Sequence, residues 1–229
     1  MGRKLGGLLF AILGLMLWAG AAAATPAGTV VVVSGSCTDR GRVLKRGDAV
    51  QISDTVDVPA GGNLTLQMAD GSVISVAPGS SMTVESYHVG GAGRHVKLSL
   101  TQGLLRAVVA PVGGPSTFEV STAVGAAAVR SGSADWFINA QPGSAQVGVL
   151  DGDVDLTSAA TGRLVSIVSH WGTRLEAGRD PVPPRNCQSA QVAQHPPPRR
   201  TNRDFLRSRA SDRNIFSNKE IRHQRLLLV

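Results

Sequence analysis

The chain has 229 residues, of which 42% are hydrophobic and 4% aromatic, and its formal net charge is +7. This composition is typical of a globular protein and excludes a collagen-like or wholly disordered one. Two cysteines are too few for a disulfide-rich scaffold or a four-cysteine zinc site. The charge is uneven: residues 1–24 carry +2, residues 25–184 carry −2 (11 Lys and Arg against 13 Asp and Glu), and residues 185–229 carry +7 (10 against 3). The middle segment is therefore not a basic, nucleic-acid-binding domain.

The N-terminus has the pattern of an export signal. Arg3 and Lys4 precede an uncharged apolar run over residues 5–18, and the small residues that signal peptidase accepts follow at 21–24. We predict a signal peptide over residues 1–24, cleaved after Ala24, and a periplasmic or secreted protein. The alternative is an uncleaved membrane anchor, because no charged residue occurs between 5 and 38.

Residues 25–184 alternate between apolar and polar side chains with a period of two, which indicates half-buried β-strands. Turn signals rich in Gly and Pro separate the strands, and no helical periodicity spans three turns. The fold class predicted is all-β, a single antiparallel β-sandwich or β-roll of about 10–13 short strands. The strands expected are 29–33, 50–58, 63–68, 73–76, 82–84, 96–100, 104–109, 118–120, 136–138, 147–150, 154–156 and 164–168.

One turn carries a specific prediction. Asp70-Gly71 separates the strands at 63–68 and 73–76. This dipeptide favours a hairpin with a type I′ turn, because both central residues of that turn need positive φ.

Short motifs follow one another along the β segment in a fixed order: Leu44-Lys45-Arg46-Gly47-Asp48, Asp70-Gly71-Ser72, Ala77-Pro78-Gly79-Ser80, Ser86-Tyr87, Phe118-Glu119-Val120-Ser121-Thr122, Ala128-Val129-Arg130 and Leu150-Asp151-Gly152-Asp153-Val154. This ordered set resembles the FecR-type domain of bacterial periplasmic proteins over about residues 28–179. The resemblance implies an all-β periplasmic domain over 25–184 with a sensing or interaction role and no catalysis. We expect no cofactor.

Two features depart from the family pattern. Family members usually continue with Gly-Thr-x-Phe after the Val-Arg pair, whereas this chain has Ser131 to Trp136 there. The regulator of that family also carries a cytoplasmic segment that handles a sigma factor, but only Met1 to Lys4 precede the apolar run. We therefore expect this chain to lack the arm that regulates a sigma factor.

Cys37 and Cys187 lie near the two ends of the middle segment. Export would place them where disulfides form, so they are candidates for a bridge closing a loop of about 150 residues, worth up to ~5 kcal/mol. The alternative is two free thiols.

We expect no metal or catalytic site. Asp151, Asp153 and Asp155 lack the Gly and Glu that an EF-hand needs after its third carboxylate. No G-x-S-x-G motif occurs, and serines in Gly-rich turns are expected to cap backbone groups. The residues left for a cryptic hydrolase are Ser80, Ser81, Ser131 and Ser133 with Asp70 or Asp135 and His170.

Residues 185–229 form a Pro- and Arg-rich basic tail. The simplest prediction is a solvated, disordered segment, because too few apolar residues are present to form a core. The functional alternative is an arm for an anionic membrane surface, an envelope polymer or an acidic protein, with no nucleic acid expected. The candidate contacts are Arg199, Arg200, Arg203, Arg207, Arg209 and Arg213.

Together these features predict an exported, non-enzymatic FecR-like module that binds an unknown envelope protein or ligand in sensing or regulation. The second hypothesis is a structural or polysaccharide-binding envelope protein attached through its basic tail.

Overall fold

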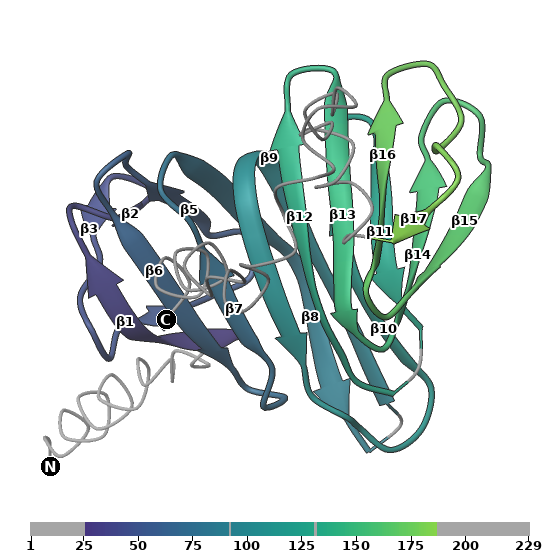
Figure 1. The fold of residues 1–229 in the computed structure, drawn as a ribbon. Coiled ribbons are helices and arrows are strands. Elements are labelled where there is room, and N and C mark those ends of the chain that lie inside the picture. The colour runs from purple at the N-terminus through teal and green to yellow at the C-terminus, as the bar shows by residue number, and fades with distance from the viewer. Residues whose placement is uncertain (1–25, 92, 131, 187–229) are drawn as a thin grey trace, which may run out of the picture.

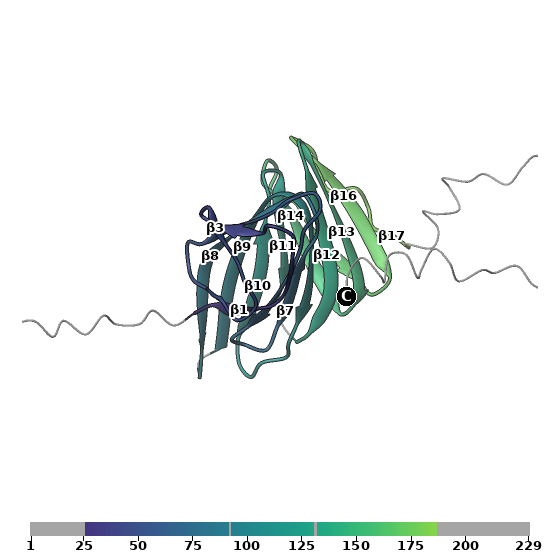
Figure 2. The ribbon, with the colours of Figure 1, turned by 90° about the vertical axis from the view of Figure 1, so that its left-hand side faces the viewer.

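The computed structural model describes residues 26–91, 93–130 and 132–186. These residues form strands and turns without a helix, so none of them belongs to a helix that could cross a membrane. The strands are joined by hydrogen bonds into one continuous sheet that is folded into two layers (Figure 1). Figure 2 turns the molecule so that the layers stand side by side.

The first layer, sheet A, contains nine strands that include the C-terminal half of β9. Their spatial order is β4 (Ala49–Val50), β1 (Gly28–Ser34), β6 (Asn63–Met68), β7 (Val73–Val76), β9 (Gly93–Val109), β12 (Ala134–Gln141), β13 (Ser144–Asp151), β16 (Trp171–Glu176) and β17 (Arg185–Asn186).

The second layer, sheet B, contains nine strands that include the N-terminal half of β9. Their order is β3 (Arg42–Val43), β2 (Thr38–Asp39), β5 (Thr55–Val58), β8 (Ser80–Gly90), β9, β10 (Ser116–Ser121), β11 (Gly125–Val129), β14 (Asp153–Ser158) and β15 (Leu164–Val168).

The strand β9 joins the layers because its pairing partners change at Gly103. Residues before Gly103 pair with β8 and β10, whereas residues from Gly103 onward pair with β7 and β12. Gly103 has φ of 91°, and a Cβ there would lie 2.6 Å from the Cα of Ser80. Only glycine fits this close crossing without strain.

The core lies between the two layers and consists mainly of Val, Leu, Ile and Ala. Inward-facing residues alternate along each strand, as in β6 and β9, where the side chains of Leu64, Leu66 and Leu98 are completely buried. The only aromatic side chains among the fully buried residues described are Trp136 and Phe118. The all-β two-layered fold predicted from the period-two pattern is confirmed.

Details of that prediction need correction. Seventeen strands are described in place of 10–13, because four strands of two residues are too short to show periodicity. The sheet is not wholly antiparallel, since β10 runs parallel to β9. The sequence pattern also missed β11 and β16. β11 is rich in alanine, which does not produce an apolar and polar alternation.

The strand expected over 50–58 is interrupted. The Asp54 carboxylate accepts a hydrogen bond from the Gln51 N–H at 2.7 Å, and Ser53 adopts a positive φ of 70°. This local turn divides the segment into β4 and β5 and leaves Ile52 exposed.

The hairpin predicted at Asp70-Gly71 is present, but its turn is not type I′. Gly71 has positive φ whereas Asp70 does not, and the Gly71 N–H donates to the Met68 carbonyl at 3.1 Å. The chain therefore makes a turn over Met68–Gly71 that ends on a left-handed glycine. This conformation leaves the Asp70 carboxylate inside the molecule.

Candidate functional site

An ion pair between Arg94 and Asp70 is buried at the end of the sandwich where β8 meets β9. Both side chains have an exposed fraction of 0%, and Arg94 Nη1 lies 2.8 Å from Asp70 Oδ2. The strand β9 brings Arg94 to this place because residue 94 shares the inward face with Val96 and Leu98. A charge at an inward position needs a partner, and the β6–β7 turn supplies it.

The rest of the Arg94 guanidinium is also satisfied. Nη1 donates to the Ala110 carbonyl at 2.8 Å, and Nε and Nη2 donate to Ser116 Oγ at 3.1 and 2.8 Å. The Phe118 ring lies with its centroid 5.7 Å from the guanidinium carbon. We call Asp70, Ser72, Tyr87, Arg94, Ser116 and Phe118 the Arg94 cluster.

Asp70 is held from its other side by Tyr87 and Ser72. The Tyr87 hydroxyl donates to Asp70 Oδ1 at 3.2 Å and accepts the Asp70 N–H at 2.7 Å, and Ser72 Oγ donates to Oδ2 at 2.8 Å. Burial alone would raise the pKa of Asp70, but hydrogen bonds from Arg94 and Ser72 lower that pKa overall. Burial and the Asp70 charge raise the pKa of Tyr87 well above its ordinary value. The cluster therefore stays ionised at Asp70 and neutral at Tyr87 near pH 7.

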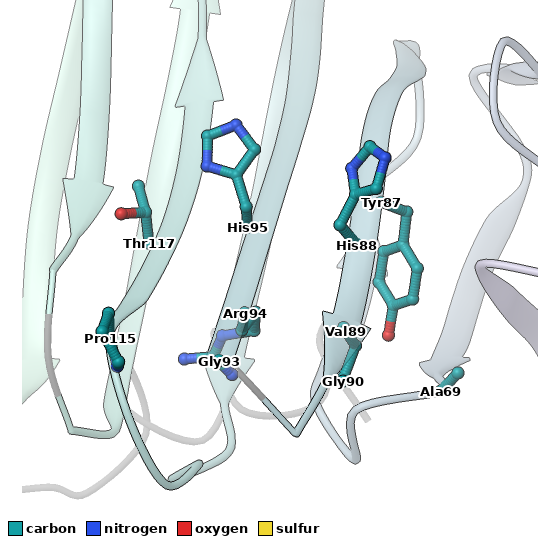
Figure 3. A pocket seen from close by; sticks show the side chains of 10 residues that line it. All are labelled: Ala69, Tyr87, His88, Val89, Gly90, Gly93, Arg94, His95, Pro115 and Thr117. Atoms are coloured by element: carbon teal, nitrogen blue, oxygen red, sulfur yellow. The ribbon is translucent and has the colours of Figure 1, made fainter.

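An open hollow of about 800 Å³ lies against this cluster (Figure 3). His88 on β8 pairs with His95 on β9, and His95 pairs with Thr117 on β10, so the three side chains form a row on the outside of sheet B. Tyr87 and Arg94 point to the other side of the same strands. Apolar groups complete the wall: Ala69, Val89 and Pro115.

This hollow is suited to binding and not to nucleophilic chemistry. Arg94 and Tyr87 are already engaged with Asp70, so neither is available to activate a substrate. The rim offers two imidazole rings and a hydroxyl for hydrogen bonds, beside a small apolar wall. Such a mixed, shallow surface is typical of protein contacts more than of enclosed small-molecule sites.

A second hollow of about 480 Å³ lies on the outside of sheet A. The ring of Phe137 covers Gly148, where a Cβ would lie 2.6 Å from ring atom Cε1. Gly148 pairs with Gly172, and Gly172 pairs with Arg185. The two glycines therefore form the base of the hollow between Phe137 and Arg185. Val182 and Arg174 line its other sides. This surface also combines apolar and basic groups at shallow depth.

The serine, aspartate and histidine residues considered for hydrolysis are not brought together. Ser80 accepts a hydrogen bond from the Leu104 N–H at 3.0 Å, and Ser81 donates to Asp57 at 2.6 Å. Asp135 pairs with Arg106 at 2.8 Å, while His170 lies in the turn between β15 and β16. Ser131 is outside the described residues. Ser80 therefore caps the backbone, as its place in a glycine-rich turn predicts.

The three aspartates near 153 also have separate roles. Asp155 binds Arg130 at 3.2 Å and Ser166 at 2.5 Å, whereas Asp151 and Asp153 are exposed. Within residues 26–91, 93–130 and 132–186, no three His, Cys, Asp or Glu side chains are grouped as metal ligands.

The predicted disulfide remains a prediction. The Cys37 thiol is buried and donates to the Ser34 carbonyl at 3.2 Å, while Cys187 lies outside the described residues. β17, which ends one residue before Cys187, lies across the molecule from β2, which follows Cys37 (Figure 1).

The six arginines proposed as contacts for an acidic partner also lie outside the described residues: Arg199, Arg200, Arg203, Arg207, Arg209 and Arg213.

Sequence reasoning missed the Arg94 cluster. A signal was present, because Arg94 occupies the phase of Val96, Leu98 and Leu100, which predicts an inward-facing charge. Its partner could not be found, because the sequence predicts only a hairpin turn at Asp70-Gly71 and not the direction of the Asp70 side chain. Ser72 and Tyr87 enter the sequence analysis only as parts of family motifs, and Asp70 also enters it as a turn residue and as a candidate acid of a hydrolase.

These observations define an all-β, two-layered protein with a buried ion pair under shallow surface hollows. The model of the family described as FecR protein matches residues 54–155, which run from the residue before β5 into β14 and include the whole Arg94 cluster. This part of the β domain therefore matches the FecR family, as the motifs indicated.

Two solved structures are similar to this chain. Both are of a "putative anti-sigma factor" from Parabacteroides distasonis ATCC 8503, at 1.65 and 2.50 Å resolution, with 16% sequence identity and a TM-score of 0.48. They cover 61% and 62% of this chain, and the chain spans 64% of the length of that protein. No curated protein matches the sequence.

Proposed function

We propose that this chain is an exported FecR-like protein whose β domain binds another envelope protein in sensing or regulation, without catalysing a reaction. The observation that carries the proposal is the FecR family match over residues 54–155, which covers the centre of both sheets. The Arg94 cluster lies inside the matched part, and its hydrogen bonds join β9 to the β6–β7 turn and to Ala110. We therefore assign it a role in stability. The hollows beside it offer mixed polar and apolar surface, as partner-binding sites do.

Export is part of the same proposal. The basic residues, the apolar run and the small residues over 1–24 support removal of a signal peptide after Ala24 and release into the periplasm or outside the cell. N-terminal sequencing of the protein purified from its envelope fraction tests this step. We expect Thr25 as the first residue, and Met1 on a membrane-bound protein would contradict it.

Partner binding is tested by affinity capture from envelope extracts. The mature chain, a chain that ends after Asn186 and an isolated 187–229 peptide serve as baits. We expect the first two baits to retain the same protein at physiological salt, since the proposed contact lies on the β domain. Retention only by baits that contain residues 187–229 would contradict the proposal.

The second candidate is a structural or polysaccharide-binding protein. One observation favours it: half-buried hydroxyl side chains lie side by side across the outer face of sheet B, in the order Thr55, Thr83, Ser99, Ser121. Such a row could follow the hydroxyl groups of an extended glycan. Co-sedimentation of the chain ending after Asn186 with purified envelope polysaccharide would favour this candidate, and its absence at millimolar sugar would exclude it.

A further inference from the structure

The strand β15 stands out among the strands at the ends of the two sheets. Three of those four end strands, β3, β4 and β17, have only two residues each, whereas β15 has five. Within the described residues, β15 pairs only with β14. Its sequence, Leu-Val-Ser-Ile-Val, contains no charge and no proline, the features that usually protect an exposed edge.

The backbone groups on the open side of β15 can be assigned. The Ser158 N–H donates to the Arg163 carbonyl at 2.9 Å, and hydrogen-bonded pairs alternate along an antiparallel ladder. Val165 and Ile167 therefore direct their backbone groups to β14. Leu164, Ser166 and Val168 direct theirs to the open edge.

The same three residues carry the exposed side chains. Leu164 and Val168 are 46% and 49% exposed, and Ser166 is also exposed, whereas Ile167 is completely buried. The edge thus offers unpaired backbone groups and exposed apolar side chains at one set of positions. An occupant must be an extended, uncharged strand with apolar side chains beside Leu164 and Val168.

We propose that this occupant is the β15 strand of a second copy of the chain, paired antiparallel about a two-fold axis at Ser166. In this register Ser166 faces Ser166 and Leu164 faces Val168 of the other copy. Every edge-facing residue of one copy, 164, 166 or 168, then lies opposite an edge-facing residue of the other copy. All three pairs can therefore exchange backbone hydrogen bonds. The segment 187–229 as a whole fits this edge less well, since it carries nine Lys and Arg residues. Its uncharged stretches, 187–194 and 226–229, are the competing occupant that the truncation below tests.

Electrostatics permit this pairing. The charged residue nearest to the two-fold axis is Asp155, which lies beside Ser166 on β14. Its carboxylate binds Arg130 of its own chain at 3.2 Å. Across the two-fold axis the two Asp155 strands are three strand spacings apart, about 14 Å. This separation exceeds the Debye length of about 8 Å at physiological salt. Association should therefore strengthen slightly when salt is raised from a low level.

A pairing of two five-residue strands buries less surface than a standard interface, so we expect a weak dimer. The first test is sedimentation equilibrium of the mature chain from about 10 µM to 1 mM. Ser166→Pro removes one edge-facing N–H and leaves the ladder to β14 complete. We expect it to weaken dimerisation at least tenfold, while the matched Ser166→Ala dimerises like the wild type. Equal dimerisation of the Pro and Ala variants would overturn the proposal.

The second test does not depend on how Pro is tolerated. In a hydrogen-bonded antiparallel pair the Cα atoms lie about 5.5 Å apart, within disulfide range. Ser166→Cys should therefore form a disulfide-linked dimer under mild oxidation, whereas Leu164→Cys, equally exposed but off the axis, should not. The native Cys37 and Cys187 are present in both variants and serve as the common background.

Three results would overturn the proposal: a monomer up to 1 mM, equal crosslinking of the two cysteine variants, or a dimer only after residues 187–229 are removed. The last result would assign the β15 edge to the basic segment of the same chain, and that contact should weaken as salt is raised.

Discussion

At the scale of single residues, Arg94 and Asp70 depend on each other because both side chains are completely buried. Arg94→Met would leave the Asp70 carboxylate without its cation, and we expect a loss of about 3–5 kcal/mol in the free energy of unfolding. Urea denaturation measures this loss. The matched control is Arg130→Met, because Arg130 is 59% exposed, makes a single contact with Asp155 at 3.2 Å and should cost at most about 1 kcal/mol. Equal losses in the two variants would contradict a structural role for the Arg94 cluster.

The lowered pKa of Asp70 predicts a pH dependence of stability. Because this pKa is lower in the folded than in the unfolded protein, the unfolded state binds more protons in acid. The contribution is fully present above the unfolded value, near pH 4, and is lost as pH falls through the folded pKa. We expect Asp70→Asn to be less stable at neutral pH and to lose less stability between pH 4 and pH 2. An acid slope that is unchanged in Asp70→Asn but flattened in Asp135→Asn would show that another pair is responsible.

At the scale of elements, Gly103 is the point at which β9 passes from one layer to the other. Gly103→Ala would combine a strained positive φ with a clash against the Ser80 backbone, and we expect a cost of about 3 kcal/mol or more. Gly143→Ala is the control, since Gly143 also has positive φ but no atom lies within 4 Å of a Cβ there. Thermal unfolding should show a clearly larger drop for Gly103→Ala. Similar drops would mean that the crossing is not tightly packed.

Most strands could be predicted from the sequence, but not all of them. Period-two alternation was sufficient for β6, β7 and β14, because each has one buried and one outward face. It failed for β11, where Gly125 packs against the Thr157 backbone and alanines fill both faces. It also divided β9 at Gly103, because the buried positions change there from even-numbered residues, such as Leu98 and Leu100, to odd-numbered ones, such as Leu105, as they would between two separate strands.

The site was less accessible to sequence reasoning than the fold. Whether Asp70 faces solvent or Arg94 depends on the conformation of one turn, and the pairing joins residues 24 positions apart. The position of β15 at an edge likewise depends on the order of all the strands in sheet B. Neither property is encoded in a local pattern.

At the scale of the whole molecule, the folded part and the basic segment are expected to act separately. The net charge of −2 on residues 25–184 gives the β domain no general attraction to anionic surfaces, whereas residues 185–229 carry +7. We expect the mature chain to bind anionic vesicles at low salt and to lose this binding at about 0.5 M salt. A chain ending after Asn186 should not bind them. Equal binding by the two chains in a vesicle sedimentation assay would contradict a role for the tail.

The central claim is that the FecR-type β domain itself contacts an envelope protein. Photo-crosslinking in living cells tests it most directly, with a photoreactive residue at Thr117 beside the first hollow or at Gln146 beside the second, in the full chain and in the chain ending after Asn186. We predict a discrete adduct with a different envelope protein from at least one of these positions, present in both chains. Adducts that vanish when residues 187–229 are removed, or that never form from either position, would contradict the account.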